Sequence, residues 1–102
     1  MKNKSQIQPD YDLRLFIAGA SPNSLRAISN MRAFCEEYLK GRYHLEIIDV
    51  YQQPQIATKN QVIALPLLIK SFPLPLKRLI GDMSDKAKVM KGLDLEVTLT
   101  IE

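Results

Sequence analysis

The sequence holds a single cysteine, Cys35, and a single histidine, His44. One cysteine excludes an intramolecular disulfide and a C-x-x-C metal site, and one histidine without companion ligands gives no support for metal binding. Cys35 falls on the apolar stripe of a predicted helix, which favours a small buried hydrophobe over a reactive thiol. His44 stands at the start of a predicted strand, where we expect a surface side chain. We therefore expect neither a cofactor nor a metal site.

Long hydrophobic runs are also missing. No stretch of about 18 apolar residues and no secretory leader pattern is present, which predicts a cytoplasmic protein without membrane partners. The net charge of +3 is small and well mixed, so nucleic acid is not an expected partner. The length of 102 residues is that of one domain. Residues 1–10 are polar and aperiodic, so we predict a flexible tail before a single domain over residues 11–102.

The most informative segment joins a predicted strand, Tyr11–Ile17, to a long amphipathic helix. Ser21 stands where an N-cap belongs, and Pro22 occupies the first helical position. This is a thioredoxin-type opening in which Ser21 and Ser24 replace the two cysteines of an oxidoreductase. Redox chemistry needs a thiolate at the positive end of the helix dipole, and a hydroxyl cannot supply it. We therefore predict that both serines serve in capping and that the protein does not carry out thiol–disulfide exchange.

Helical spacing predicts how this first helix continues. Its apolar stripe is formed by Leu25, Ile28, Met31 or Arg32, Cys35 and Leu39. Gly41 predicts the end of the helix as its C′ residue. A second strand is predicted over 43–50, apolar enough for the interior of a sheet. A strand, helix and strand of these lengths imply a right-handed parallel crossover.

A short helix is predicted over 55–60, and an apolar stretch over 62–69 is interrupted by Pro66. A proline in a central strand removes a ladder donor, so the position demands an edge, a bulge or a special bond. In thioredoxin-like folds a proline at this place is cis and faces the active-site loop. Leu65 and Pro66 fit that position, and an X-Pro bond makes the cis form accessible at roughly 0.5 to 1 kcal/mol.

The last third of the chain carries two conflicting patterns. A strand over 76–80 and a helix from Asp85, capped by Ser84, would complete a thioredoxin-like βαβαββα fold. The helix would place Val89, Met90 and Leu93 on one face, and Asp82 and Asp85 would complement its dipole. The period of two from Leu93 to Glu102, however, predicts a strand. Gly92 stands between the two patterns, and replacing it by alanine should favour the helix by about 1 kcal/mol.

Several short motifs are spread along the domain. They are Leu15-Phe16-Ile17-Ala18-Gly19, Pro22-Asn23-Ser24, Ile48-Asp49-Val50, Pro54-Gln55, Ala64-Leu65-Pro66, Ile80-Gly81-Asp82-Met83-Ser84-Asp85-Lys86 and Gly92-Leu93-Asp94-Leu95. Together these motifs resemble the KaiB family of circadian clock proteins, and the match runs without an evident gap from about Tyr11 to Leu95.

This resemblance implies a function and a second fold. KaiB proteins are non-enzymatic partners of the hexameric ATPase KaiC, and they exchange between a self-associated ground state, βαββααβ, and a thioredoxin-like monomer that docks on KaiC. Residues 11–50 would be common to both folds and residues 51–102 would switch, with Pro66, Gly92 and Asp94 as fold-switch residues. Self-association as a dimer or tetramer is implied as well. Cations at Lys70, Lys77 and Arg78 would contact an acidic partner surface, or would be an ordinary solvated face.

Departures from the family pattern limit what the resemblance implies. Glu46 stands on the predicted strand that docks KaiA, where cyanobacterial members commonly carry lysine, and the reversed charge places KaiA binding in doubt. Thr58 and Lys59 replace a commonly acidic pair, and the usual acidic tail is absent. These departures favour a homologue outside the core cyanobacterial oscillator, and its role is either in circadian rhythm or in stress adaptation, the role proposed for such relatives in bacteria without a full clock. A stably folded interaction module in the stress response that does not bind KaiC, and a redox or glutathione-binding enzyme, stay as alternatives.

Overall fold

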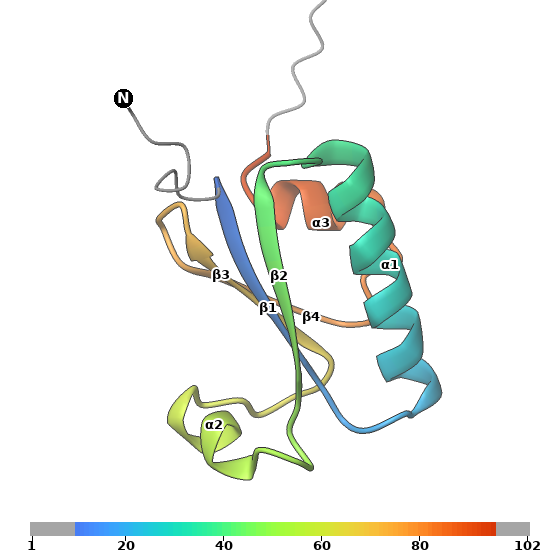
Figure 1. Cartoon of the computed structure of the whole chain (residues 1–102), viewed down its shortest axis with the longest axis vertical. Coiled ribbons are helices and arrows are strands. Elements are labelled where there is room, and N and C mark those ends of the chain that lie inside the picture. Colours follow the sequence, from blue (N-terminus) through green and yellow to red (C-terminus); the bar gives the residue numbers. More distant parts are fainter. Residues whose placement is uncertain (1–9, 96–102) are drawn as a thin grey trace, which may run out of the picture.

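The computed structural model describes residues 10–95, which form one mixed sheet flanked by helices (Figure 1). The predicted flexible tail falls almost entirely outside these residues. In chain order the elements are β1 (Tyr11–Ile17), α1 (Pro22–Tyr38), β2 (Tyr43–Asp49), α2 (Pro54–Lys59), β3 (Leu67–Phe72), β4 (Lys77–Ile80) and α3 (Lys86–Gly92). This order is the predicted thioredoxin-like βαβαββα. No helix within these residues combines the length and apolar composition needed to cross a membrane.

The strands lie in the order β2-β1-β3-β4. β1 pairs with β2 in parallel and with β3 antiparallel, so that Phe16 lies between Ile48 and Leu67. The parallel pair confirms the predicted crossover. The expectation that β2 is an interior strand is wrong, because β2 forms one edge of the sheet. His44 and Glu46 on β2 are exposed, and only Ile48 in the strand is buried.

The helices α1 and α3 lie on one side of the sheet and α2 lies on the other (Figure 1). A hydrophobic core lies on each face of the sheet. The larger one joins β1, α1, β4 and α3 through buried residues that include Leu15, Met31, Leu79 and Val89. The smaller one lies on the other face around Phe16, with side chains from the α2 region packed against it. Successive side chains of β1 point alternately into these two cores. This alternation explains why the last three residues of the strand, Leu15, Phe16 and Ile17, are all buried.

The helix α1 departs from its predicted stripe at one position. Leu25 is 54% exposed, whereas Ala27 and Phe34 are buried. The face of α1 that packs on the sheet therefore includes Ala27 and Phe34 and leaves out Leu25, which differs from the face that spacing alone predicts. The helix ends at Tyr38 with Leu39 as its C-cap, so the C′ residue is Lys40 and the predicted C′ residue, Gly41, lies one position further on. A φ of +77° at Gly41 explains why glycine follows the helix.

The structure differs from the sequence prediction at Pro66 and at the cap of the last helix. β3 begins at Leu67, so Pro66 precedes the strand instead of interrupting it, and the Leu65–Pro66 peptide is cis as predicted. α3 is capped by Asp85, whose carboxylate accepts from the backbone N–H of Lys88, and not by Ser84. Ser84 instead donates its backbone N–H to Asp82. The alternating segment predicted as a strand lies mostly beyond Leu95, outside the described residues.

Candidate functional site

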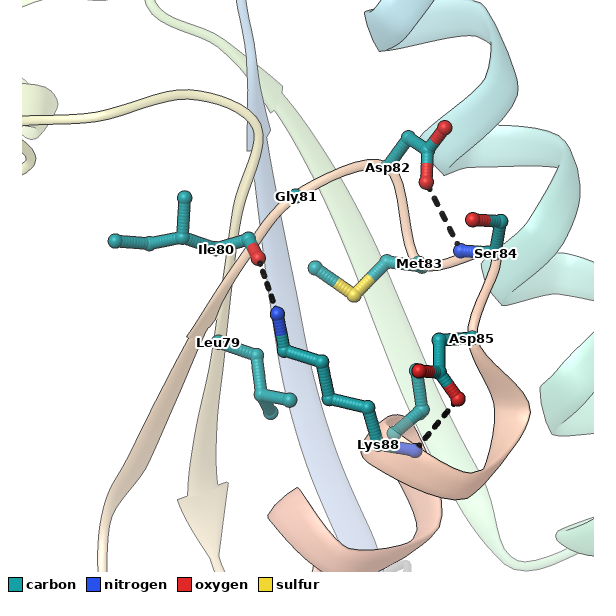
Figure 2. A pocket seen from close by; sticks show the side chains of 9 residues that line it. Leu79, Ile80, Gly81, Asp82, Met83, Ser84, Asp85 and Lys88 are labelled. Carbon is teal, nitrogen blue, oxygen red and sulfur yellow. Dashed lines mark hydrogen bonds between the residues drawn. The ribbon is translucent and has the colours of Figure 1, made fainter.

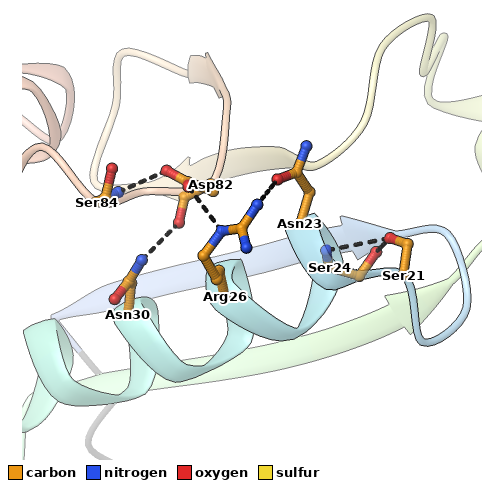
Figure 3. Close-up of polar contacts among 7 residues, drawn as sticks. All are labelled: Ser21, Asn23, Ser24, Arg26, Asn30, Asp82 and Ser84. Carbon is orange, nitrogen blue, oxygen red and sulfur yellow. Dashed lines mark hydrogen bonds and ion pairs between the residues drawn. The ribbon is translucent and has the colours of Figure 1, made fainter.

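The N-terminus of α1 occupies the place where a thioredoxin-like enzyme keeps its thiols. Ser21 Oγ accepts a hydrogen bond from the Ser24 backbone N–H at 3.2 Å and donates to Ser24 Oγ at 2.8 Å (Figure 3). Ser24 is buried, and its Oγ also accepts from the Ala18 N–H at 3.0 Å and donates to the Ala18 carbonyl. The Ser21 and Ser24 hydroxyls are thus both engaged in fixing the turn that begins the helix.

Cys35, the only thiol of the chain, is buried in the larger core. Burial, with a smaller contribution from the negative charge of Glu36, raises the pKa of the Cys35 thiol to about 12. The thiol is therefore protonated at neutral pH and inaccessible to a substrate. His44 lies on the exposed edge strand, and within residues 10–95 no group of three potential ligands could hold a metal ion.

A polar network joins α1 to the loop between β4 and α3 (Figure 3). Arg26 Nε lies 3.2 Å from the Asp82 carboxylate and its guanidinium also bonds Asn23, while Asn30 donates to the Asp82 backbone carbonyl at 2.9 Å. Hydrogen bonds from Ser84 and then the guanidinium of Arg26 hold the pKa of Asp82 below its ordinary range. The sequence suggested only a helix-dipole role for Asp82, because its partners on α1 are more than fifty residues away.

The same loop borders a small pocket of about 160 Å³ beneath the start of α3 (Figure 2). Lys88 Nζ donates to the Ile80 carbonyl at 3.3 Å across it, and Asp85 is occupied in capping α3. Within the described part of the chain every buried side-chain nitrogen or oxygen has a hydrogen-bond partner. The pocket therefore presents no unsatisfied polar group that would point to a ligand.

Lys70, one of the three predicted partner-binding cations, is not accessible to a partner in this fold. Its side chain is fully buried on the α3 side of the sheet. The ammonium group donates to the Pro73 carbonyl at 2.7 Å and lies 3.4 Å from the Asp94 carboxylate. The prediction that Lys70 contacts an acidic partner surface is therefore wrong for this fold, because the side chain instead links β3 to the end of α3.

Lys77 and Arg78, the other two predicted partner-binding cations, lie on β4 at the open edge of the sheet. Lys77 is 40% exposed at its side chain, and its ammonium lies 3.7 Å from Asp94. The exposed Arg78 donates to the carbonyls of Asn60 and Gln61 at 3.0 and 2.8 Å. Arg78 therefore holds the loop after α2 against the sheet, a contact across 18 residues that the sequence pattern did not reveal.

Two of the three predicted fold-switch residues, Gly92 and Asp94, lie at the end of α3. Gly92 is the last helical residue, and a Cβ at this position would lie 2.6 Å from Leu79 Cδ1 and 2.8 Å from its Cγ. Asp94 follows with a φ of +58°, in the left-handed region. The third predicted fold-switch residue, Pro66, immediately precedes β3. Gly92 therefore packs the end of α3 against Leu79 of β4. Asp94, two residues later, lies beside the ammonium group of Lys70.

Sequence comparisons match most of the chain to one family. The KaiB domain profile matches residues 14–95. The circadian clock oscillator protein KaiB of Prochlorococcus marinus (strain MIT 9312) is 48% identical over 85 residues, 83% of this chain and 81% of that protein. The KaiB of Microcystis aeruginosa (strain NIES-843 / IAM M-2473) is 43% identical over 91 residues, 89% of this chain and 88% of that protein.

Solved structures with a similar fold include the N-terminal domain of Synechococcus elongatus SasA. Its TM-score is 0.71 at 19% identity, covering 99% of this chain and 97% of that domain. Oxidized mitochondrial thioredoxin 3 of Saccharomyces cerevisiae has a TM-score of 0.68 at 20% identity, with coverage of 85% and 79%. At such low identity these likenesses establish the thioredoxin-like fold alone.

Proposed function

Because this chain belongs to the KaiB family, we propose that it is a non-enzymatic regulatory protein that binds a KaiC-type hexameric ATPase. Binding would modulate the phosphorylation or ATPase cycle of that enzyme in the cytoplasm. The observation that carries the proposal is 43–48% identity to circadian clock oscillator proteins over at least 83% of the chain. The hydroxyls of Ser21 and Ser24 and the buried, protonated Cys35 support a binding role over redox catalysis.

The negative charge of Glu46 on β2 favours partners other than KaiA. Glu46 is exposed on this edge strand and pairs in register with Arg14 of β1. The family resemblance implies a lysine at this position in cyanobacterial members, and the carboxylate of Glu46 reverses that charge. We therefore propose that the chain acts with a KaiC-type ATPase outside the three-protein oscillator, in stress adaptation.

The test is co-elution of the full chain with the KaiC-type ATPase of its own source in the presence of ATP, sampled after minutes and after many hours. We expect a complex to form, and its slow accumulation over hours would indicate that the chain leaves a second fold before it docks. Absence of a complex at every time, while the ATPase is folded and active, would overturn the proposal. An insulin-reduction assay run in parallel should show no turnover.

A matched pair of variants tests the cations on β4. Lys77→Gln removes a half-exposed ammonium from the open edge of the sheet, whereas Lys40→Gln removes an exposed one after α1. If Lys77 contacts the ATPase, its variant should bind about fivefold to tenfold more weakly, and the Lys40 variant should bind as the wild type does. Equal binding by both variants would remove Lys77 from the interface. Thermal unfolding of each variant controls for lost stability.

A further inference from the structure

The chain leaves α3 through a turn that folds it back over the helix. The Leu95 N–H donates to the Met90 carbonyl at 2.9 Å, and the Asp94 N–H donates to the Lys91 carbonyl at 3.1 Å. With Leu93 as the C-cap and a left-handed φ of +58° at Asp94, these two bonds form a Schellman motif. In this motif the second residue after the cap packs on the third residue before it. Leu95 therefore lies beside Met90, one turn back from the end of the helix.

An open groove of about 520 Å³ begins at this contact. Its lining is formed by Lys86, Ala87, Met90, Lys91 and Leu95. At about 100° per residue, Ala87 and Met90 lie between the two lysines around the helix. The groove therefore has an apolar floor with a lysine at each rim. Ala87 is exposed, and Met90 and Leu95 are half-buried, so this floor faces water in the described part of the chain.

The lysines of α3 differ in what they contact. Lys86 Nζ lies 3.0 Å from the Glu37 carboxylate on α1. Lys88 is not among the groove residues and donates to the Ile80 carbonyl. Lys91 makes no ion pair within the part of the chain that the structure describes. The groove therefore attracts a carboxylate most strongly at its Lys91 rim.

The next seven residues of the chain fit this groove in pattern and length. Residues 96–102 read Glu-Val-Thr-Leu-Thr-Ile-Glu. In an extended chain, side chains two residues apart share a face, so Leu95 in the groove places Val97 and Leu99 on the same face. The step from Leu95 to Leu99 spans about 13 Å. The stretch of helix in the groove rises only about 8 Å, so these two side chains are sufficient to cover the floor.

Connectivity favours the segment of the same copy over a second molecule. Leu95 is itself a lining residue of the groove, so no linker separates residues 96–102 from it. Even a short flexible linker gives an effective concentration on the order of millimolar. A contact within one copy also leaves the thioredoxin-like fold monomeric.

We propose that residues 96–102 fold back over α3 of their own copy and cover the groove. Val97 and Leu99 would pack on the apolar floor, and the Glu96 carboxylate would lie beside the Lys91 ammonium. A partner that docks on this face of α3 would first have to displace the segment. The end of the chain would therefore control access to α3.

Methyl NMR of the full labelled chain tests the contact directly. Nuclear Overhauser effects should join the methyl groups of Val97 and Leu99 to those of Ala87 and Met90. A sample mixed from isotope-labelled and unlabelled copies shows whether an effect arises within one copy or between two. Effects found only between copies, or no effects once these methyl groups are assigned, would overturn the proposal.

A matched pair of variants measures what the apolar side chains contribute. Val97→Asn with Leu99→Asn changes the groove face, whereas Thr98→Asn with Thr100→Asn changes the opposite face. We expect the first pair to lower the hydrogen-exchange protection of the Leu95 amide about fivefold and the second to leave it within about twofold. Equal protection in both variants would overturn the proposal. Neither measurement needs an ATPase, so the outcome is independent of the proposed function.

Discussion

The ammonium group of the fully buried Lys70 lies 3.4 Å from the carboxylate of Asp94, 24 residues further along the chain. Lys70 belongs to β3, and Asp94 follows α3 with a left-handed backbone. Besides Asp94, the ammonium donates to the Pro73 carbonyl at 2.7 Å. A buried charge needs such partners, because removing one of them leaves the charge without compensation.

Replacing Asp94 by asparagine should therefore lower the free energy of unfolding by about 1 kcal/mol. Asparagine tolerates the left-handed conformation, so the change removes charge without adding backbone strain. In a Lys70→Met background the same substitution should have a smaller effect, since the buried ammonium is gone and only the half-exposed one of Lys77 remains near Asp94. Urea denaturation of the four proteins in this double-mutant cycle measures the difference. Equal effects in both backgrounds would show that the pair contributes no coupling.

The end of α3 sets two effects of Gly92→Ala against each other. Alanine improves helix propensity by about 1 kcal/mol, which the sequence alone predicts to favour this fold. The structure adds the contact of the new Cβ with Leu79, which must then move. We expect Gly92→Ala to be more favourable in a Leu79→Ala background than in the wild type, by about 1 kcal/mol or more.

Denaturant unfolding of both single variants and the double variant tests this coupling. Leu79→Ala by itself should cost about 2–5 kcal/mol, because it opens a cavity in the core, so each effect is measured against its own background. An identical effect of Gly92→Ala in both backgrounds would mean that Leu79 moves aside without energetic cost.

The network around Asp82 predicts how stability depends on pH. The pKa of Asp82 is lowered in the folded state from its ordinary value of 3.8. The unfolded chain therefore binds the proton more readily, and this contribution to stability is present above the ordinary pKa and lost as pH falls through the folded one. Asp82→Asn should lower the midpoint of thermal unfolding at about pH 6, and the difference from the wild type should shrink as pH falls through the lowered pKa of Asp82. A constant difference across that range would contradict the assignment.

Burial and a raised pKa predict that Cys35 is inert in the folded protein. With a pKa of about 12 the thiolate is scarce at neutral pH. Thiol reagents should label Cys35 at least about a hundredfold more slowly in the native protein than in urea, because labelling must wait for opening of the core. Mass spectrometry of timed samples measures both rates. Fast native labelling would revive the redox alternative.

Local signals predicted most of the elements. Ser21, Pro22 and the spacing after them fixed the start of α1, and Leu65–Pro66 indicated the cis bond before β3. The errors arose where burial depends on the neighbours of an element. Leu25 has the right spacing for the core but faces water, and β2 is apolar enough for an interior strand yet forms an edge. Neither difference could be found by spacing, because spacing does not state how a helix is rotated or which strand lies outermost.

The sequence by itself determined the family, the β1-α1-β2 order of the first half and the lack of a thiol pair, since each of these depends on residue identity and short-range pattern. The last third carried patterns for both a helix and a strand, and the structure decided for β4 followed by α3. Only the tertiary structure decided that Lys70 is buried against Asp94 instead of facing a partner. It alone also placed Arg26 on Asp82 and Arg78 on the loop after α2. These contacts join residues 17 to 56 positions apart, and their energies depend on distances and burial that a one-dimensional pattern does not contain.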